Sequence, residues 1–245
     1  LRSGRGGGAP VHDMGAQREL ESRLLRDGFL IIDGALPGSA ASFVEEMARL
    51  DGSLTAGGQR CPRVLWVDEV AAGKEHRAPA VAAAVVLLKS VADALNPILT
   101  RHALDRAADG DPRYTGVPAW PATEKAVLTV PPRALVSTYP GGGDGGPPHA
   151  DTAYDASHGC RVNHRELTAV LFANPSDWKG VHDGGYLQLW PHSTLQRKKH
   201  SVVIEPLGGR LLVFFSVFRH QVVRTNRDMR TLTLWILRPE AEHRP

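Results

Sequence analysis

The chain has 245 residues, 42% of them hydrophobic, which is enough to fill the core of one globular domain. Its 29 basic and 26 acidic residues leave a net charge of only +3, so the basic excess of a nucleic-acid-binding protein is missing and we expect no nucleic-acid partner. Two isolated cysteines, Cys61 and Cys160, and the lack of a long apolar run exclude a disulfide framework, a cysteine zinc site and a membrane span, and favour the cytoplasm or another reducing compartment.

The first part of the chain is predicted to be helical. Residues 1–14 read as a flexible tail, and because the chain begins with Leu rather than Met we expect it to be a trimmed fragment. Residues 15–110 then form a helical support, with two amphipathic helices and a short strand between them: residues 17–26, 39–50 and 29–33. A long helix follows from Pro79, and Pro97 is predicted to kink or split it.

The character of the sequence changes to β-rich from residue 126 onwards. Short runs of β-branched and aromatic residues are separated by Gly, Pro and Asn: residues 134–139, 167–172, 186–190, 201–205, 210–215, 220–224 and 231–237. Helices first and evenly spaced strands afterwards predict a mainly β fold, a double-stranded β-helix (a cupin-like jelly roll) over residues 126–238 with the N-terminal helices packed on one face. We expect residues 15–245 to form a single domain and a monomer.

Three potential metal ligands stand out in this β-rich part. His149 and Asp151 are two residues apart, so in an extended strand both side chains point to the same side and can reach one ion. His220 is expected to reach the same ion from another strand. Two imidazoles and one carboxylate occupy one face of a metal octahedron and leave the other face free for a co-substrate and dioxygen.

The segments around these ligands resemble the Fe(II)/2-oxoglutarate dioxygenases, in particular the prolyl 4-hydroxylase branch and, within it, the oxygen-sensing prolyl hydroxylases. The resemblance covers residues 25–237. It is carried by YPGGGDGGPPH (139–149), LFANPSDW (171–178), GGYLQL (184–189), GRLLVFFS (209–216) and HQVV (220–223). It implies His149, Asp151 and His220 as Fe(II) ligands and as the catalytic centre, with 2-oxoglutarate and O₂ as co-substrates and ascorbate as an accessory reductant.

The resemblance also implies which residues hold 2-oxoglutarate. Its far carboxylate needs a cation inside the barrel, and Arg230 has the family's spacing from the second histidine. Strict alternation, however, groups Arg230 with Leu232 and opposite Trp235, whereas the relatives keep the basic residue and the Trp on one face. A bulge after residues 226–228 would reconcile this; otherwise Arg227 or Arg224 becomes the candidate.

Two further residues concern the same co-substrate. Tyr139 matches a tyrosine that binds 2-oxoglutarate in the relatives. Phe172 stands where the oxygen-sensing relatives carry a second such tyrosine, and Thr168, on the same strand face, is expected to supply a hydroxyl instead. Alternatively, Tyr139 and Thr168 are ordinary core residues of the barrel without a binding role.

Four residues are candidates for substrate contact by their position. Arg60 and Trp66 lie in RCPRVLW (60–66), which resembles the family segment that closes over a peptide, and Arg165 and Trp235 match positions near the substrate. Both tryptophans have an alternative as core aromatics. We expect a groove between a hinged flap at residues 57–66 and the loop at residues 151–166.

The sequence thus predicts an Fe(II)- and 2-oxoglutarate-dependent hydroxylase that acts on a prolyl residue of a protein or peptide and releases succinate and CO₂. One alternative is a hydroxylase of a free amino acid or small metabolite. A second alternative is a catalytically silent jelly-roll binding module, against which the complete set of metal ligands speaks.

Overall fold

The computed structural model describes most of the chain, except for the two ends and several internal segments. The described segments are residues 22–36, 38–56, 62–109, 128–152, 154–155, 160–161, 163–191 and 201–237. The predicted tail at residues 1–14 lies outside them.

The centre of the fold is an antiparallel sheet of seven strands. Its order is β1 (Phe29–Ile32), β10 (Leu211–Phe215), β7 (Arg165–Phe172), β12 (Met229–Leu237), β4 (Ala134–Tyr139), β3 (Arg63–Val67) and β2 (Thr55–Ala56). The neighbouring strands β10, β7 and β12 are buried along almost their whole length, as expected of strands that are covered on both faces.

A smaller sheet covers the inner face of this large sheet. It consists of β11 (Arg219–Val222), β8 (Leu187–Trp190) and β9 (Val202–Ile204), and β5 (Tyr154–Asp155) pairs separately with β6 (Cys160–Arg161). Between the two sheets lies an inner core of buried side chains that includes Val170, Phe172, Leu189, Phe214 and Met229. This double-sheet arrangement is the double-stranded β-helix that the sequence predicts.

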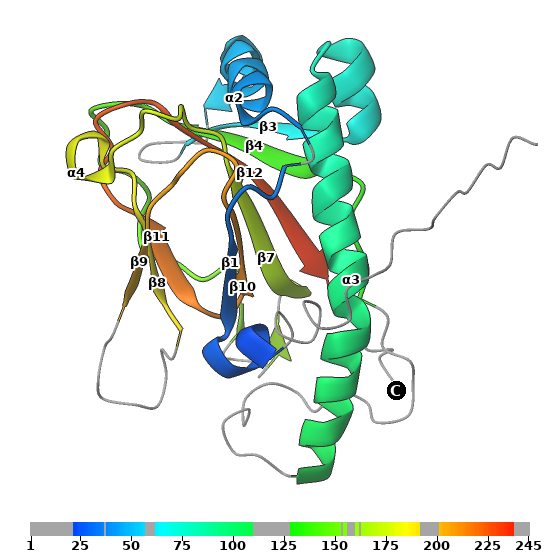
Figure 1. The fold of residues 1–245 in the computed structure, drawn as a ribbon. Helices are drawn as coiled ribbons and strands as arrows, with labels where there is room; N and C mark the ends of the chain where they lie inside the picture. Colours follow the sequence, from blue (N-terminus) through cyan, green and yellow to red (C-terminus); the bar gives the residue numbers. More distant parts are fainter. Residues whose placement is uncertain are drawn as a thin grey trace, which may run out of the picture.

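The outer face of the large sheet carries the helices (Figure 1). The α3 helix (Pro79–Asp109) runs along this face, and α2 (Ala40–Arg49) packs beside it. Buried Glu46 of α2 joins the two helices, because its carboxylate accepts hydrogen bonds from the free N–H groups of Ala80 and Val81 in the first turn of α3 (2.7 and 3.0 Å). The outer core lies between these helices and the sheet.

The helical part departs from the sequence prediction in two places. The α3 helix continues through Pro97 without a break. A short π-helix (Ala71–Glu75) and the β3 strand precede it, and neither was expected, since the periodic patterns used for the prediction need longer runs. No described helix combines the length and apolar character that a membrane span requires.

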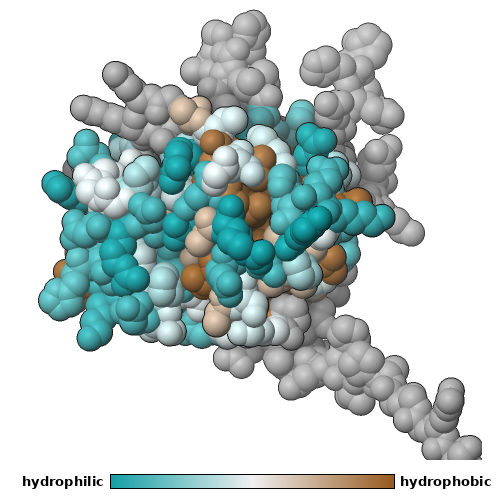
Figure 2. All heavy atoms as spheres, turned by 90° about the horizontal axis from the view of Figure 1, so that it is seen from above, coloured by the Kyte–Doolittle hydropathy of each residue, from teal (hydrophilic) through white to brown (hydrophobic). Residues whose placement is uncertain are grey.

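The face that carries α2 and the edge strands β2 and β3 is mixed in character. Figure 2 shows hydrophobic side chains in the middle of this face with hydrophilic residues around them. Trp66 of β3 is the largest exposed apolar side chain among the described residues, with 47% of its surface accessible.

Candidate metal centre and active site

His149 and His220 are brought together by the backbone. They form an isolated antiparallel bridge in which each N–H donates to the other residue's carbonyl (2.9 and 2.8 Å). His220 belongs to β11, whereas His149 follows the glycine-rich segment at residues 141–146. Segments that are far apart in the sequence therefore meet at one edge of the inner sheet.

The glycine-rich segment can approach β11 because it lacks side chains. At Gly145 the backbone has φ 76°, and a Cβ atom there would lie 2.2 Å from the carbonyl oxygen of Val222. The next residue, Gly146, donates to that same oxygen (2.9 Å). The segment is thus a bend that delivers His149 to β11, and only glycine fits at position 145.

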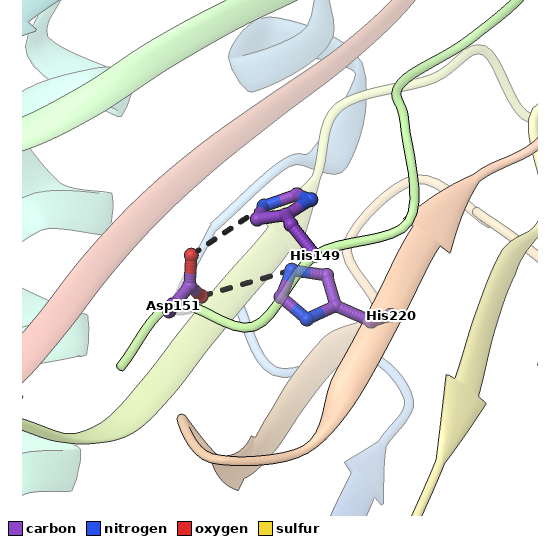
Figure 3. A group of neighbouring side chains, drawn as sticks. All are labelled: His149, Asp151 and His220. Atoms are coloured by element: carbon purple, nitrogen blue, oxygen red, sulfur yellow. Dashed lines mark ion pairs between the residues drawn. The ribbon is translucent and has the colours of Figure 1, made fainter. Parts of the chain in front are cut away.

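The three predicted ligands converge (Figure 3). The Nε2 atoms of His149 and His220 lie 3.6 and 3.7 Å from the two carboxylate oxygens of Asp151. One ligand atom from each residue lies within 4.8 Å of the others. Asp151 and His220 are buried, whereas about half of the His149 side chain is exposed (49%), so the group opens to solvent on one side.

Both imidazoles are held in the orientation that a metal ligand needs. The Nδ1 atom of His149 lies 2.9 Å from the carbonyl oxygen of Pro147, and Nδ1 of His220 lies 3.1 Å from that of Phe218. A carbonyl can only accept, so each Nδ1 carries a proton and Nε2 is the atom that can bind a metal. Without a metal, the hydrogen bond to Asp151 raises the pKa of His149. Burial also lowers the pKa of His220, which favours its neutral, ligating form.

Asp151 is held as an anion. Burial by itself would raise its pKa, but the contacts with His149, His220 and the Thr168 hydroxyl outweigh this and lower the pKa to about 2. Thr168 of β7 donates to Asp151 (2.7 Å) and shares a second hydrogen bond with Ser216 (2.8 Å). Thr168 thus orients the carboxylate, rather than only lining the barrel, and Ser216 is a supporting residue that sequence reasoning missed.

These features fit a divalent transition metal. Two neutral imidazole nitrogens and one carboxylate oxygen on a single side form the donor set of non-haem Fe(II) oxygenases. The buried Asp151 carboxylate also carries a negative charge that a bound cation would offset. His149, Asp151 and His220 would hold this ion.

An aromatic and cationic group adjoins the triad. The guanidinium of Arg165 lies over the ring of Trp235, 3.7 Å from its centroid, and 3.8 Å from the Asp151 carboxylate. Trp235 in turn lies beside exposed Trp66, with ring centroids 5.7 Å apart. The indole Nε1 of Trp235 is buried on the side of Asp151 and helps to lower the pKa of that carboxyl group. Arg60, the fourth predicted substrate residue, lies outside the described residues.

Arg230 is not part of this site. The β12 strand pairs with β4 and β7 without a register shift from Met229 to Ile236, so the bulge that would turn Arg230 inward does not form. Arg230 lies on the outer, helix-facing side of the sheet, where Nε and Nη2 both contact Asp51 (3.1 and 2.5 Å). The expectation that Arg230 grips a co-substrate inside the barrel is therefore wrong, because alternation, and not spacing from His220, decides the face.

The two alternative arginines also lie away from the triad. Arg227 pairs with Asp177 and Asp183 (3.3 and 3.4 Å) in the turn before β12, and Arg224 is exposed. Tyr139 lies opposite Met229 in the β4–β12 register and packs against the inner core.

The fold and the triad together define a class of protein, the metal-dependent oxygenases built on a double-stranded β-helix. A sequence model described as the 2OG-Fe(II) oxygenase superfamily matches residues 134–237. This segment contains all three ligands and is similar to that superfamily, whose members are dioxygenases that use Fe(II), 2-oxoglutarate and O₂. No curated protein sequence matches the chain.

Solved structures support the same fold. A prolyl hydroxylase from Trichoplax adhaerens, in complex with a peptide of hypoxia-inducible factor, is 20% identical with a TM-score of 0.66 and 91% and 89% of the two chains covered. A Pseudomonas putida prolyl-4-hydroxylase is 21% identical with a TM-score of 0.63 and coverage of 91% and 100%. An α-ketoglutarate-dependent epimerase of nogalamycin biosynthesis, SnoN, is 13% identical with a TM-score of 0.55 and coverage of 92% and 82%. The fold therefore serves more than one reaction.

Proposed function

We propose that the chain hydroxylates a prolyl residue within a protein or peptide. The observation that carries this proposal is the group formed by Trp66, Trp235 and Arg165 beside the metal triad. Exposed aromatic rings such as that of Trp66 are the usual partners of proline-containing extended segments, and a guanidinium can donate to a peptide carbonyl. The fold shared with the two prolyl hydroxylases supports the same substrate class.

The residues of this chain have separate tasks in the proposed reaction. His149, Asp151 and His220 bind the metal, and Thr168 holds the carboxylate in place. In this family the metal, O₂ and a 2-oxo acid together supply the oxidant for hydroxylating an unactivated carbon. Trp235 and Trp66 would orient the substrate ring and exclude water.

The proposal is tested with proline-containing peptides in the presence of Fe(II), ascorbate, 2-oxo acid and O₂. We expect a mass gain of one oxygen on a prolyl residue, measured by tandem mass spectrometry. Trp66→Ala should reduce peptide turnover strongly, whereas Trp66→Phe, which keeps an aromatic ring, should retain most of it. Equal turnover by Trp66→Ala and the unchanged chain contradicts the role of this ring.

Arg165 favours one alternative substrate, a free amino acid whose carboxylate would pair with the guanidinium. Free proline and free aliphatic amino acids belong in the same assay. Hydroxylation of free proline without hydroxylation of any peptide replaces the peptide proposal by this alternative. Arg165→Gln then decides the matter, since it should abolish turnover of the free amino acid.

A further inference from the structure

The space inward from the triad decides which 2-oxo acid fits. In 2-oxoglutarate one end carries the 2-oxo acid group and the other a second carboxylate. A carboxylate taken into a protein interior needs a cation or several strong donors, because its lost hydration is otherwise not replaced. The side chains along the inner face of the sheet therefore determine whether the site can accept a co-substrate with a second carboxylate.

These side chains can be followed from the triad by the strand register. Thr168, which bonds Asp151, lies opposite Trp235. The next inward pairs along β7 and β12 are Val170 with Thr233, and Phe172 with Thr231. All four of these side chains are buried. The inner-face positions that follow Thr168 on β7 thus offer hydroxyl groups and apolar surface, whereas the charged Arg165 precedes Thr168 on that strand.

The end of the inner face away from the triad, called the closed end below, is lined by apolar side chains and by Tyr139. Met229, the first inward residue of β12, and Phe172 of β7 are both fully buried in the inner core. The Met229 side chain also approaches Gly185, where an added Cβ atom would lie 3.2 Å from its Cγ. Tyr139, opposite Met229, supplies the polar group at this end.

The arginines of β12 and of the turn before it already have acidic partners. Arg227 lies over the Trp178 ring (5.4 Å) and pairs with Asp177 and Asp183. Arg230 is held by Asp51 on the other face of the sheet, and only a one-residue slip of β12 would turn it inward. Such a slip would also move Met229, Thr231 and Trp235 out of the interior. The charged end of 2-oxoglutarate would thus meet hydroxyl groups here, while Arg230 and Arg227 are paired with aspartates.

From this lining we infer that the chain selects 2-oxo acids with an uncharged far end, such as 2-oxo monocarboxylic acids with a short aliphatic chain. The inference rests on the proposed metal centre and specifies its co-substrate. Met229 and Phe172 are the residues that set the preference, because they occupy the space in which a charged end would need an arginine or a hydroxyl donor.

The matched probes are 2-oxoglutarate and 2-oxopentanoate, which have equally long carbon chains and differ in a carboxylate against a methyl group at the far end. Binding is measured by isothermal titration calorimetry to the full chain loaded with Zn(II), without O₂ and without a peptide. We expect 2-oxopentanoate to bind at least as tightly as 2-oxoglutarate. Tighter binding of 2-oxoglutarate by about tenfold or more, as one charge-assisted contact would give, overturns the inference.

Two variants test the residues that set the preference. Met229→Arg places a cation at the closed end and should tighten 2-oxoglutarate binding roughly 10- to 100-fold while weakening that of 2-oxopentanoate. Phe172→Tyr adds only a hydroxyl group, so it serves if the larger change impairs folding, and it should shift the affinity ratio in the same direction. An unchanged ratio in a folded variant counts against the assignment.

Arg230→Gln is the discriminating third variant. It should leave the affinity ratio as it is, and a selective loss of 2-oxoglutarate binding would return the role to Arg230 and overturn the inference. Failure of the metal centre gives a separate result, since a chain that takes up no Zn(II) overturns the proposed function itself. Metal uptake with a clear preference for 2-oxoglutarate overturns only the co-substrate assignment.

Discussion

The side chain of Thr168 has the most specific role of the residues around the triad. Its hydroxyl donates to the Asp151 carboxylate and is fixed by Ser216 on the other side. Residues that orient metal ligands in this way contribute to metal affinity without touching the metal, because they limit the orientations of the free ligand. Ser216 lies 48 residues after Thr168, so no local pattern in the sequence could have indicated the pair.

Thr168→Val should therefore weaken metal binding about tenfold, the lower end of the range for such residues. The measurement is a titration with Mn(II) or Zn(II), with Thr168→Ser as the variant that keeps the hydroxyl and restores affinity. Thr55→Val, at an exposed hydroxyl on β2, is the matched control and should bind metal as the unchanged chain does. Unchanged affinity in Thr168→Val removes the proposed role.

Arg230 has the predicted spacing from His220, but it lies on the outer face of the sheet, where it pairs with Asp51. Their pair joins β12 to the 3-10 turn after α2 (Leu50–Ser53), and both side chains are mostly buried. Breaking one partner of a buried pair leaves the other uncompensated, so Arg230→Gln should lower the free energy of unfolding by about 3 kcal/mol. Urea unfolding measures this, and a change within experimental error would show that the pair is dispensable.

The same pair predicts a pH dependence of stability. Burial tends to raise the pKa of Asp51, but the hydrogen bonds from Arg230 and Thr138 outweigh it, so the pKa is below its ordinary value of 3.8. A carboxylate with a lowered folded pKa stabilises the fold above its unfolded pKa, and this contribution is lost as the pH falls through the folded pKa. Asp51→Asn should therefore show a shallower loss of stability below pH 3.8 than the unchanged chain. Parallel acid-unfolding curves would contradict this.

At the scale of elements, the glycine bend and β11 act as one unit. Gly142 and Gly145 both have positive φ, but only Gly145 faces a neighbouring backbone, since nothing lies within 4 Å of a Cβ atom at Gly142. Gly142→Ala should cost about 1–2 kcal/mol of stability from the backbone conformation and leave metal binding intact. Gly145→Ala should cost more and weaken metal binding, because it displaces the segment that carries His149.

Thermal unfolding of the two glycine variants measures the cost of backbone strain. Metal titration of the same variants measures whether the segment that carries His149 has been displaced. If both variants bind metal equally well, the bend is not needed to place His149.

The strands were more predictable than their surroundings. The sequence predicts β4 with its observed bounds and places β7 and β10 within two residues, because buried strands are short apolar runs bounded by Gly, Pro or Asn. Strict alternation along β12 also gave the correct face of Arg230, and the error came from overriding it with an expected bulge. β3 was missed because RVLWV has no alternation to distinguish it from a loop near glycines.

At the scale of the whole molecule, the two faces of the large sheet have different roles. Its outer face packs on α2 and α3, and its inner face, with the small sheet, holds the metal triad. The histidines and the aspartate were predictable because a two-residue spacing and strand ends limit where their side chains can go. The side chains at the closed end of the inner face were not predictable, because they depend on the register in which β7, β12 and β4 pair.

The most direct test of the account is O₂ consumption by the Fe(II)-loaded chain with a 2-oxo acid, since it needs no knowledge of the hydroxylated substrate. We expect consumption that depends on both Fe(II) and the 2-oxo acid, with 2-oxoglutarate and 2-oxopentanoate each supplied, and loss of it in Asp151→Ala although that variant stays folded. Consumption by Asp151→Ala equal to that of the unchanged chain, or none by the unchanged chain with either acid, would contradict the assignment of His149, Asp151 and His220 as an oxygenase centre.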